Sequence, residues 1–361
     1  MPSPAAASLA ERSTARLWTS HLRCFVLPVA CIAFLATAPH RPAASLAWLL
    51  VLVGSVWADV RTRPERRQPP AGLVGWPFDA LLRVLAGAQL AIVALLAGMV
   101  AVHGFWRVDT AIALLLVGVN SGYSAIVVAH ELIHRREPHL RLLGRMLLCT
   151  VLYEHFFTEH LRGHHVRVGT PADPATARFG ERFGAFFLRT VPGQLRSAWR
   201  LEAMRLGATD LPWWHPRLLG ASRVAHGLAV EWTAALALLA GAGPGAFAVY
   251  LLQACVAVGL LEAVNYMEHW GLVRDGRRVT SVDSWDTDSA FTLYTLVGLS
   301  RHADHHAHPA RPYQHLRFAE DSPKLPAGYF GSVLLLLFWN ARFRQLMTAE
   351  LHRRRLGPFA T

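Results

Sequence analysis

Apolar residues gather in long runs in the first half of the chain, and polar residues collect between these runs instead of alternating with them. Two runs, Val84–Val102 and Thr110–Ala129, have about the 20 residues that a helix needs to cross the hydrocarbon of a bilayer. Four others are shorter or more diluted: Cys24–Ala38, Ala43–Ala58, Ala225–Ala242 and Pro244–Val264. The pattern predicts an all-α integral membrane protein with six transmembrane helices.

Two polar stretches separate or follow these runs. One covers residues 135–222, between the fourth and fifth spans, and the other covers residues 271–361. Neither contains an internal repeat or a flexible linker. We therefore expect one membrane domain over residues 1–361, in which residues 24–134 form four spans, residues 223–270 form two, and the polar stretches form a helical lobe.

Arginine placement predicts the orientation of the spans. The N-terminal arm, Arg61–Arg67 and His134–Arg136 fall on one side of the membrane if the helices alternate in direction. Positive residues favour the cytoplasmic side of short loops. The N-terminal arginines before Cys24 could also precede a signal peptide, but the further spans favour a retained first helix. The lobe is therefore expected on the cytoplasmic side.

Composition agrees with a membrane protein, because 53% of the residues are hydrophobic and only 17% are charged. A net charge of +12 can indicate a nucleic-acid partner, but here the basic residues lie between apolar segments, so topology explains them and no nucleic acid is expected. The cysteines form no CxxC pair, which argues against a disulfide framework and a thiolate metal site: Cys24, Cys31, Cys149 and Cys255.

Nine of the 19 histidines lie in four short clusters. In the first cluster, the four-residue step from His130 to His134 places both imidazoles on one helix face. The second repeats this step from His160 to His164, and the adjacent His165 is expected to point elsewhere. Two metal ions could therefore be touched by these two clusters.

The third cluster holds His302, His305 and His306, with three- and four-residue steps and the same doublet ending. The fourth is a single histidine, His269, where the sixth span leaves the membrane. One such cluster alone is often explained by packing or surface exposure, but four together predict a metal centre.

The number of imidazoles narrows the metal. Structural zinc takes four ligands and catalytic zinc takes three with a water, so nine imidazoles overfill a zinc site. Imidazole suits iron, and nine ligands divide as four and five over two ions. The absence of thiolates argues against an iron–sulfur cluster, and the absence of inward Glu-x-x-His pairs argues against a carboxylate-bridged pair. We predict two non-haem iron ions held by His130, His134, His160, His164, His165, His269, His302, His305 and His306.

Four carboxylates lie beside the predicted ligands: Glu131, Glu159, Glu268 and Asp304. We expect them to accept the second ring N–H of the ligand imidazoles, which fixes the direction of each ring, and one of them could bridge the irons. Plain solvated acids are the alternative. The other histidines are not assigned as ligands. His155 and His308 lie close enough in the sequence to support a ligand histidine. Three more lie outside the clusters and are left unassigned: His139, His215 and His315. Five more are incidental: His21, His40, His103, His226 and His352.

At these clusters the chain resembles the membrane-bound alkane monooxygenases, relatives of the membrane fatty-acid desaturases and hydroxylases and of xylene monooxygenase. The resemblance covers roughly residues 45–340 and includes Asn265–Leu272, Gly169–Thr176, Val191–Gly193, Ser284–Trp285 and His308–Tyr313. It implies the nine histidines as ligands of a cytoplasmic di-iron centre, in the inner membrane of a bacterium. It further implies O2 as co-substrate and electrons from rubredoxin or ferredoxin with an NAD(P)H-dependent reductase.

The implied reaction is hydroxylation of a terminal C–H bond, converting an n-alkane that arrives from the bilayer to a primary alcohol. Two positions depart from the family pattern, Trp270 in place of tyrosine and Arg135 in place of lysine, and we expect them to affect the substrate range more than the reaction type. No rubredoxin-like module with CxxC pairs follows at the C-terminus, so a separate electron donor is expected. Arginines that could dock it are Arg136, Arg162, Arg167 and Arg301.

Other functions stay open at this point. A fatty-acyl desaturase or hydroxylase, or a xylene-type methyl monooxygenase, would use the same metal site on another substrate. An intramembrane zinc protease would use His130, Glu131 and His134 as an HExxH motif and leave the other clustered histidines idle. A metal carrier without catalysis is the remaining class, and the paired spacing of the histidines does not favour it.

Overall fold

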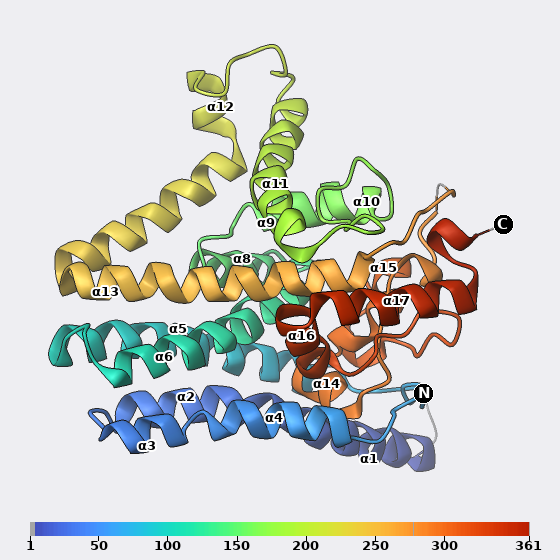
Figure 1. Cartoon of the computed structure of the whole chain (residues 1–361), viewed down its shortest axis with the longest axis horizontal. Helices are drawn as coiled ribbons and strands as arrows, with labels where there is room; N and C mark the ends of the chain where they lie inside the picture. The colour runs from blue at the N-terminus through green and yellow to red at the C-terminus, as the bar shows by residue number, and fades with distance from the viewer. Residues whose placement is uncertain (1–3, 277, 361) are drawn as a thin grey trace.

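The computed structural model describes residues 4–276 and 278–360. In this part of the chain it forms helices joined by loops and no β-strand, apart from isolated bridges of Pro64 to Ser289 and of Asp286 to Lys324. The predicted all-α class is confirmed. Long helices run side by side, and shorter helices gather at one end of them (Figure 1).

Five helices within the described residues are long and apolar enough to cross a membrane. They are Ala10–Ala36, Pro42–Arg61, Trp76–His103, Val108–Ile133 and Arg223–His269. Each of the six apolar runs predicted from the sequence falls largely within one of these helices, and the last helix contains two of the runs. The length and composition of these helices indicate an integral membrane protein.

The last of these helices, α13 (Arg223–His269), is broken near its middle. Gly243 has φ 84° and ψ 177°, which is not helical, and Pro244 follows it. Glycine adopts a positive φ without a steric penalty, and proline lacks the N–H that would continue the helical hydrogen bonds. Figure 1 shows α13 doubling back on itself. Its two legs correspond to the fifth and sixth predicted spans, and the count of six crossings stays a prediction.

The first span begins earlier than predicted. Helical structure runs through α1 (Pro4–His21), the 3₁₀ turn η1 (Leu22–Phe25) and α2 (Val26–Ala36), whereas the apolar run begins only at Cys24. Alanine, leucine and arginine are good helix formers, so the helix extends into the polar residues that precede the run. The next spans are built from α3 (Pro42–Ala47), α4 (Leu50–Arg61), α5 (Trp76–His103), α6 (Val108–Asn120), the π-helical η2 (Ser121–Val127) and α7 (Val128–Ile133).

The spans pack around the second leg of α13. This leg contacts both α5 and α6, and Gly118 of α6 lies directly against Val256 of α13. Small residues permit such close approach of helices in membranes. Polar side chains are satisfied between the spans, since Gln89 accepts a hydrogen bond from Asn120 at 2.9 Å and donates one to Ser121 at 2.9 Å.

The two polar stretches fold into short helices. Residues 135–222 contain α8 (Pro138–Cys149), α9 (Phe156–Glu159), the π-helical η3 (His160–His164), α10 (His165–Arg167), α11 (Phe183–Arg205) and α12 (Pro216–Ala221). After α13 come η4 (Ser281–Asp283), α14 (Ala290–Thr295), η5 (Leu299–Arg301), α15 (His302–Ala307), η6 (Tyr313–His315), α16 (Tyr329–Phe338), α17 (Asn340–Arg354) and η7 (Gly357–Phe359). In Figure 1 the elements after α13 lie at one end of the spans, near the start of α1, while α11 and α12 project to one side.

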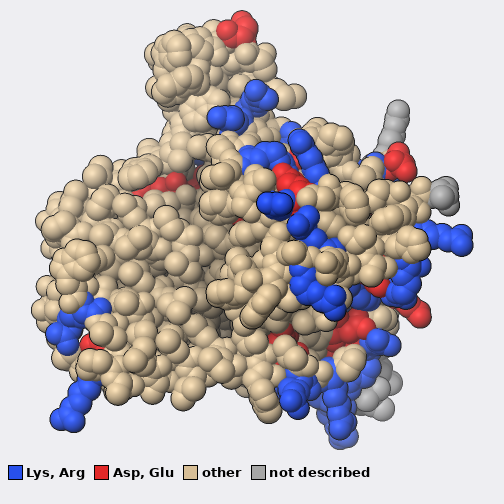
Figure 2. Space-filling view, in the orientation of Figure 1, with Lys and Arg blue, Asp and Glu red and all other residues tan. Residues whose placement is uncertain are grey.

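Charge follows the same division. Figure 2 shows Lys and Arg gathered over the end of the molecule that carries α14 to α17, whereas the face formed by the long helices away from that end is nearly uncharged. An uncharged belt is what the hydrocarbon of a bilayer requires. The lobe formed by the short helices therefore lies at the charged end of the spans.

Candidate metal centre

The nine predicted histidines come together at the charged end of the spans, in two neighbouring groups. The five-histidine group consists of His130, His134, His160, His165 and His305. The four-histidine group consists of His164, His269, His302 and His306. Within each group, one ring nitrogen of every member lies within 4.8 Å of those of the others. Among the described residues, both groups consist of histidine alone.

In the five-histidine group the Nε2 atoms converge on one another. The Nε2 of His160 lies 3.0 Å from that of His134 and 2.9 Å from that of His165, and the Nε2 of His165 lies 3.2 Å from that of His305. These rings come from the end of α7, from the η3–α10 segment and from α15. Three segments that are distant in the sequence thus aim nitrogen lone pairs at one point.

The four-histidine group is fully buried and equally compact. The Nε2 atoms of His302 and His306 lie 2.9 Å apart, one helical turn from each other on α15. The ring of His164 is 4.8 Å from that of His269 and 4.9 Å from that of His306, measured between centroids. His269 is the last residue of α13, so a membrane-spanning helix supplies this ligand position.

The two groups touch through the histidine doublets. His164 and His165 belong to different groups, as do His305 and His306. The rings of His165 and His306 are stacked with centroids 4.5 Å apart. Adjacent residues on a helix point in different directions, so each doublet contributes one ring to either group. The division into five and four has the proportions predicted from the number of ligands.

The pairing inside the second cluster differs from the prediction. The four-residue step suggested that His160 and His164 share a face, but His160 is grouped with His165, and His164 joins the other group. The cause is local: residues His160–His164 form a π-helix, and the N–H of His165 donates to the carbonyl of His160. A π-helix brings residues five apart over one another, so the predicted α-helical spacing does not apply there.

A second π-helical segment, η2, directly precedes α7 and its first ligand position, His130. π-helical turns in α-helices are rare and often occur at functional sites. Gly163 in η3 has a further reason to be glycine, because a Cβ there would collide with the carboxylate of Glu159 and the guanidinium of Arg167. The second cluster is therefore shaped by backbone geometry as well as by its histidines.

Burial favours the neutral form of five of the imidazoles in the two groups. It lowers the pKa far below the usual value, with a further contribution from neighbouring histidines, for His160, His165, His302, His305 and His306. A neutral imidazole is the form that binds a metal, since the lone pair must be free. The protein thus presents its ring nitrogens in the ligating state.

The hydrogen-bonding pattern fits a bound cation. The Nε2 of His130 and both ring nitrogens of His269 are buried without a hydrogen-bond partner. Buried polar atoms are normally paired, and each such exception needs an explanation. A metal ion at the centre of each group would accept the converging lone pairs, so the residues present fit two metal ions.

Two carboxylates contact the four-histidine group. The Nδ1 of His164 lies 2.9 Å from the carboxylate of Asp173, and the Nε2 of His302 lies 3.1 Å from that of Glu268. Asp173 is itself held by the hydroxyl of Thr176 at 2.6 Å. Asp173 was not predicted as a site residue, although the segment Gly169–Thr176 that contains it carried part of the family resemblance.

Comparison with known proteins decides the family. Residues 108–333, more than half of the chain, match the family model described as fatty acid desaturase. The chain belongs to the fatty acid desaturase family. Every histidine of the two groups lies within the matched residues.

Curated relatives of this desaturase-family chain include several alkane monooxygenases. The chain is 42% identical over 246 residues to alkane 1-monooxygenase 1 of Pseudomonas aeruginosa, which covers 63% of this chain and 61% of that protein. It is 37% identical over 254 residues to alkane 1-monooxygenase of Pseudomonas putida, covering 68% and 61%. A more distant relative, 24% identical over 213 residues, is the xylene/toluene monooxygenase hydroxylase component of Pseudomonas putida, covering 57% and 55%. The chain thus spans about three fifths of the length of these relatives.

Glu268 differs from the predicted role in this desaturase-family site. It was expected to bind the outer nitrogen of a ligand imidazole, but it faces the Nε2 of His302, the same atom that faces His306. Its other oxygen accepts a hydrogen bond from the hydroxyl of Tyr329 at 2.5 Å. Glu268 therefore lies at the edge of the four-histidine group, with one oxygen directed toward it.

Glu131 and Glu159 have other partners than a ligand imidazole. Glu131 pairs with Arg135 at 2.8 Å and accepts a hydrogen bond from the backbone N–H of Tyr313 at 3.2 Å. Glu159 accepts a hydrogen bond from Arg167 at 2.7 Å. Hydrogen bonds between two charged groups are stronger than those to neutral donors, so these buried carboxylates pair with guanidinium groups. The predicted contact with ligand rings is wrong for both.

The predicted ligand contact is also wrong for Asp304. It binds Arg311 at 2.5 Å, the backbone N–H of Arg317 at 2.8 Å and His308 at 3.1 Å. These contacts fold the loop after α15 back onto that helix. Asp304 therefore fixes the segment that carries His305 and His306 without touching their rings.

The remaining histidines stay outside both groups. His155 is buried with neither ring nitrogen hydrogen-bonded, and its ring centroid is 4.3 Å from that of Tyr153. Neither group includes His139, His215, His308, His315, His21, His40, His103, His226 or His352.

Two of the four arginines expected to dock an electron carrier are engaged inside the protein. Arg301 is buried and donates to the backbone carbonyls of Leu316 and Arg67. Arg167 binds Glu159 and Ser197. A buried or fully paired guanidinium cannot contact a partner protein at the surface. Of the four predicted arginines, Arg136 and Arg162 therefore remain as candidates for docking the electron carrier.

Trp270, which departs from the family pattern, is buried. Its indole N–H donates to the carbonyl of Glu181 at 3.2 Å, and its own carbonyl accepts from Trp285 at 3.0 Å. Trp270 therefore links the end of α13 to the loop that precedes α11. These contacts fix the residue that directly follows His269 in the sequence.

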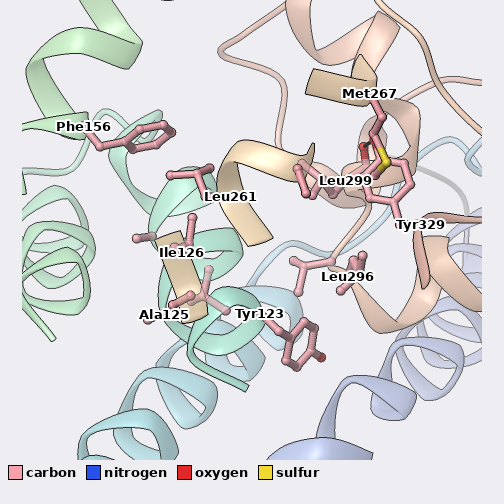
Figure 3. Close-up of a cluster of buried hydrophobic side chains, with 14 of the residues drawn as sticks. Tyr123, Ala125, Ile126, Phe156, Leu261, Met267, Leu296, Leu299 and Tyr329 are labelled. Carbon is pink, nitrogen blue, oxygen red and sulfur yellow. Dashed lines mark hydrogen bonds between the residues drawn. The ribbon is translucent and has the colours of Figure 1, made fainter. Parts of the chain in front are cut away.

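Apolar side chains reach the site from the membrane side. Figure 3 shows part of a buried cluster to which η2, α9, α13, η5 and α16 contribute, including Ile126, Leu261 and Leu299. A small cavity is lined by His130, His305, Val127, Val297, Leu299, Leu316 and Glu131. Two members of the five-histidine group thus border a small cavity, and most of its other lining residues are apolar.

Proposed function

We propose that this chain is a membrane monooxygenase that uses O2 to hydroxylate an unactivated terminal C–H bond of a hydrophobic substrate. An n-alkane, converted to a primary alcohol, is the proposed substrate class. Similarity to proteins named alkane 1-monooxygenase supports this choice. The whole of residues 1–361 is proposed to act as one unit.

One observation carries the proposal: two adjacent groups built from five and four histidines, in a chain of the fatty acid desaturase family. Each group has enough imidazoles to hold one metal ion, since even a structural zinc site takes only four ligands. Imidazole is also a suitable ligand for iron. We propose one non-haem iron ion in each group. When bound, the ions would supply the redox chemistry that activates O2.

The chain's own residues would hold and orient this centre. Asp173 fixes the ring of His164 through its Nδ1, so the Nε2 of that ring is free to bind an ion. Glu268 directs a carboxylate oxygen at the four-histidine group and is held in place by Tyr329. The apolar side chains around the site would exclude water from the reacting centre.

The small cavity beside His130 and His305 is the proposed end of the substrate path. Val127 precedes α7 in the fourth span, so this wall of the cavity continues into a membrane-spanning helix. A saturated chain makes no hydrogen bonds and would enter from the bilayer. A chain that enters end-on would bring its terminal methyl group to the histidines first.

A separate protein is the proposed source of electrons. We propose rubredoxin or ferredoxin with an NAD(P)H-dependent reductase as the donor. We place the histidine end of the spans on the cytoplasmic side of a bacterial inner membrane, where such carriers occur. The gathering of Lys and Arg at that end supports this orientation (Figure 2).

A second candidate keeps the site and changes the substrate: a fatty-acyl desaturase or hydroxylase. The description of the matched family favours it. A xylene-type methyl monooxygenase is the third possibility, supported by the more distant relative. The substrate that is turned over separates the three, and the product further separates a desaturase, which gives an alkene, from the hydroxylating enzymes, which give alcohols.

The test is turnover by membranes that contain the protein, supplied with rubredoxin, its reductase and NADH, across n-alkanes of graded length, a fatty-acyl substrate and xylene. Iron and zinc are measured on the purified protein. We expect a primary alcohol from n-alkanes and two iron ions per chain. The absence of hydroxylated product from every hydrocarbon, or one zinc ion without iron, would overturn the proposal.

A further inference from the structure

A wide basic groove lies beside the lobe, at the histidine end of the spans. It has a volume of about 960 Å³ and is formed by α1, the end of α4, residues 62–67 and α14. Six arginines and one glutamate line it: Arg16, Arg23, Arg61, Arg63, Arg66, Arg67 and Glu65. The metal centre and the small cavity beside it use none of these residues.

Half of these arginines have neither an ion pair nor a stacking partner. Arg66 pairs with Asp288 and Arg67 with Glu65, and Arg23 lies over the ring of Tyr294. For Arg16, Arg61 and Arg63, which are exposed, the described residues provide no acidic partner. Guanidinium groups bind phosphate oxygens through two parallel hydrogen bonds. The groove therefore offers unused donors for an anion that carries phosphate.

The groove opens onto an apolar face of α4. Leu50, Val53, Trp57 and Val60 lie on it at three- and four-residue steps, with exposed fractions of 68%, 61%, 64% and 57%. Trp57 also lines the groove, and Arg61 follows Val60 directly. The apolar part of this span is only 11% buried within the protein, so in the membrane it contacts lipid.

We propose that the groove binds the headgroup of an anionic phospholipid whose acyl chains lie along the exposed face of α4. Basic pockets at the ends of transmembrane helices suit such headgroups, and tryptophan is enriched at the same depth. A soluble phosphate would use the arginines alone. The continuous apolar face from Leu50 to Trp57 fits acyl chains, and for this reason a lipid is favoured over a soluble anion or an acidic protein.

The groove is linked to the segment that carries the third histidine cluster. Asp59 of α4 is buried and accepts hydrogen bonds from Ser289 at 2.6 Å and Thr292 at 2.7 Å, at the start of α14. Tyr294 of α14 donates to Glu65 at 3.1 Å. The chain then continues through η5 to α15 and its histidines. A lipid in the groove would hold α4 and α14 together and raise the melting temperature.

The test compares two triple variants of the full-length protein. Arg16→Gln, Arg61→Gln and Arg63→Gln together remove the free arginines of the groove. The matched control, Arg196→Gln with Arg200→Gln and Arg342→Gln, removes three exposed arginines that line no part of the groove and form no ion pair in the described chain. Each protein in phosphatidylcholine nanodiscs is titrated with phosphatidylglycerol, and bound lipid is counted by native mass spectrometry.

We expect the wild-type protein and the control to retain phosphatidylglycerol in preference to phosphatidylcholine and to melt at a higher temperature with it. The groove variant should bind about a hundredfold more weakly, since each arginine near a membrane surface contributes about fivefold to the binding of an anionic lipid. If the triple variant does not fold, Arg16→Gln and Arg61→Gln alone should each show about the fivefold loss.

Several results would overturn the proposal. One is equal retention of phosphatidylglycerol by the groove variant and the wild-type protein. A second is displacement of the lipid by glycerol phosphate at the same concentration as by phosphatidylglycerol, which would indicate a soluble anion. A third is unchanged lipid binding with a higher KM for rubredoxin in the groove variant, which would indicate a docking site for the electron donor.

Discussion

Asp173 lies 2.9 Å from the Nδ1 of His164, whereas the adjacent His165 turns to the other group of histidines. A carboxylate at this nitrogen holds the proton on Nδ1 and leaves the Nε2 lone pair directed at the four-histidine group. The segment that carries Asp173 is itself fixed, since Thr176 and the backbone N–H of Ala175 donate to the same side chain.

Replacing Asp173 with asparagine should weaken metal binding by about 10- to 100-fold, the usual effect of removing a carboxylate behind a ligand histidine. The amide oxygen of the asparagine could still accept a hydrogen bond, so an alanine at this position should be worse. Iron content after dialysis against a chelator measures the loss. Thr176→Val, which removes only a hydroxyl that supports Asp173, is the control and should lose less. Iron retention equal to that of the wild-type protein in the asparagine variant would show that the contact does not support a ligand.

The two histidine groups predict a graded loss of iron. His269→Ala removes one of four ligands from the four-histidine group and should lower the iron content from two ions to one per chain. His139→Ala changes an exposed histidine outside both groups and is the matched control. An unchanged iron content in His269→Ala would contradict its assignment as a ligand.

Glu131→Gln separates this site from an HExxH protease. Its carboxylate pairs with Arg135 and not with a histidine, so the iron content should be unchanged. Arg135 keeps its ion pair with Asp79 at 3.2 Å, so the variant should lose less than the roughly 3 kcal/mol of stability that an unpaired buried charge costs. An HExxH protease would instead need Glu131 for activity and would not need His269. The proteolytic activity of the Glu131→Gln and His269→Ala variants distinguishes the two functions.

The sequence predicted the spans and the nine histidines because both depend on local signals. A run of apolar residues reports a membrane helix, and the steps between His302 and His306 or between His130 and His134 report a helix face. The division of the second cluster was not predictable in this way. It depends on the π-helical turn at His160–His164, and a one-residue change in hydrogen-bond register leaves no clear mark in the composition.

The partners of the carboxylates could not be predicted either, because they join distant parts of the chain. Asp304 was adjacent to ligands in sequence but binds Arg311 and the backbone of Arg317 in the loop that follows. Asp173 is nine residues from His164 in the sequence. The contact between them depends on how the loop between α10 and α11 folds, so the sequence spacing did not predict it. Sequence spacing indicated which histidines gather in the two groups, but it did not indicate the carboxylates that contact them.

The contact between α6 and α13 should tolerate no added side chain at Gly118. A Cβ there would lie 2.5 Å from the Cβ of Val256. Overpacking of this kind costs about 1–3 kcal/mol, so Gly118→Ala should lower the melting temperature in detergent. Gly98→Ala in α5 is the control, because no atom lies within 4 Å of the added Cβ. Alanine stabilises a helix by about 0.5–1 kcal/mol relative to glycine, so this variant should be as stable as the wild-type protein or more so. Equal melting temperatures for the two variants would contradict the close packing of these helices.

His155 should make the stability of the protein depend on pH. Burial lowers the pKa of His155 to about 4, whereas in the unfolded chain the ring takes up a proton below about pH 6.5. Between these values the unfolded state binds the extra proton, so stability is lost as the pH falls from 6.5 to 4, by up to about 3 kcal/mol. Above pH 6.5 the ring is neutral in both states and the effect vanishes. Other buried histidines contribute in the same direction, so His155→Leu should make the fall of the melting temperature between pH 6.5 and pH 4 less steep without abolishing it. His139→Leu, which replaces an exposed ring, should follow the wild-type curve. Parallel curves for His155→Leu and the wild-type protein would mean that the buried ring is protonated in the folded state.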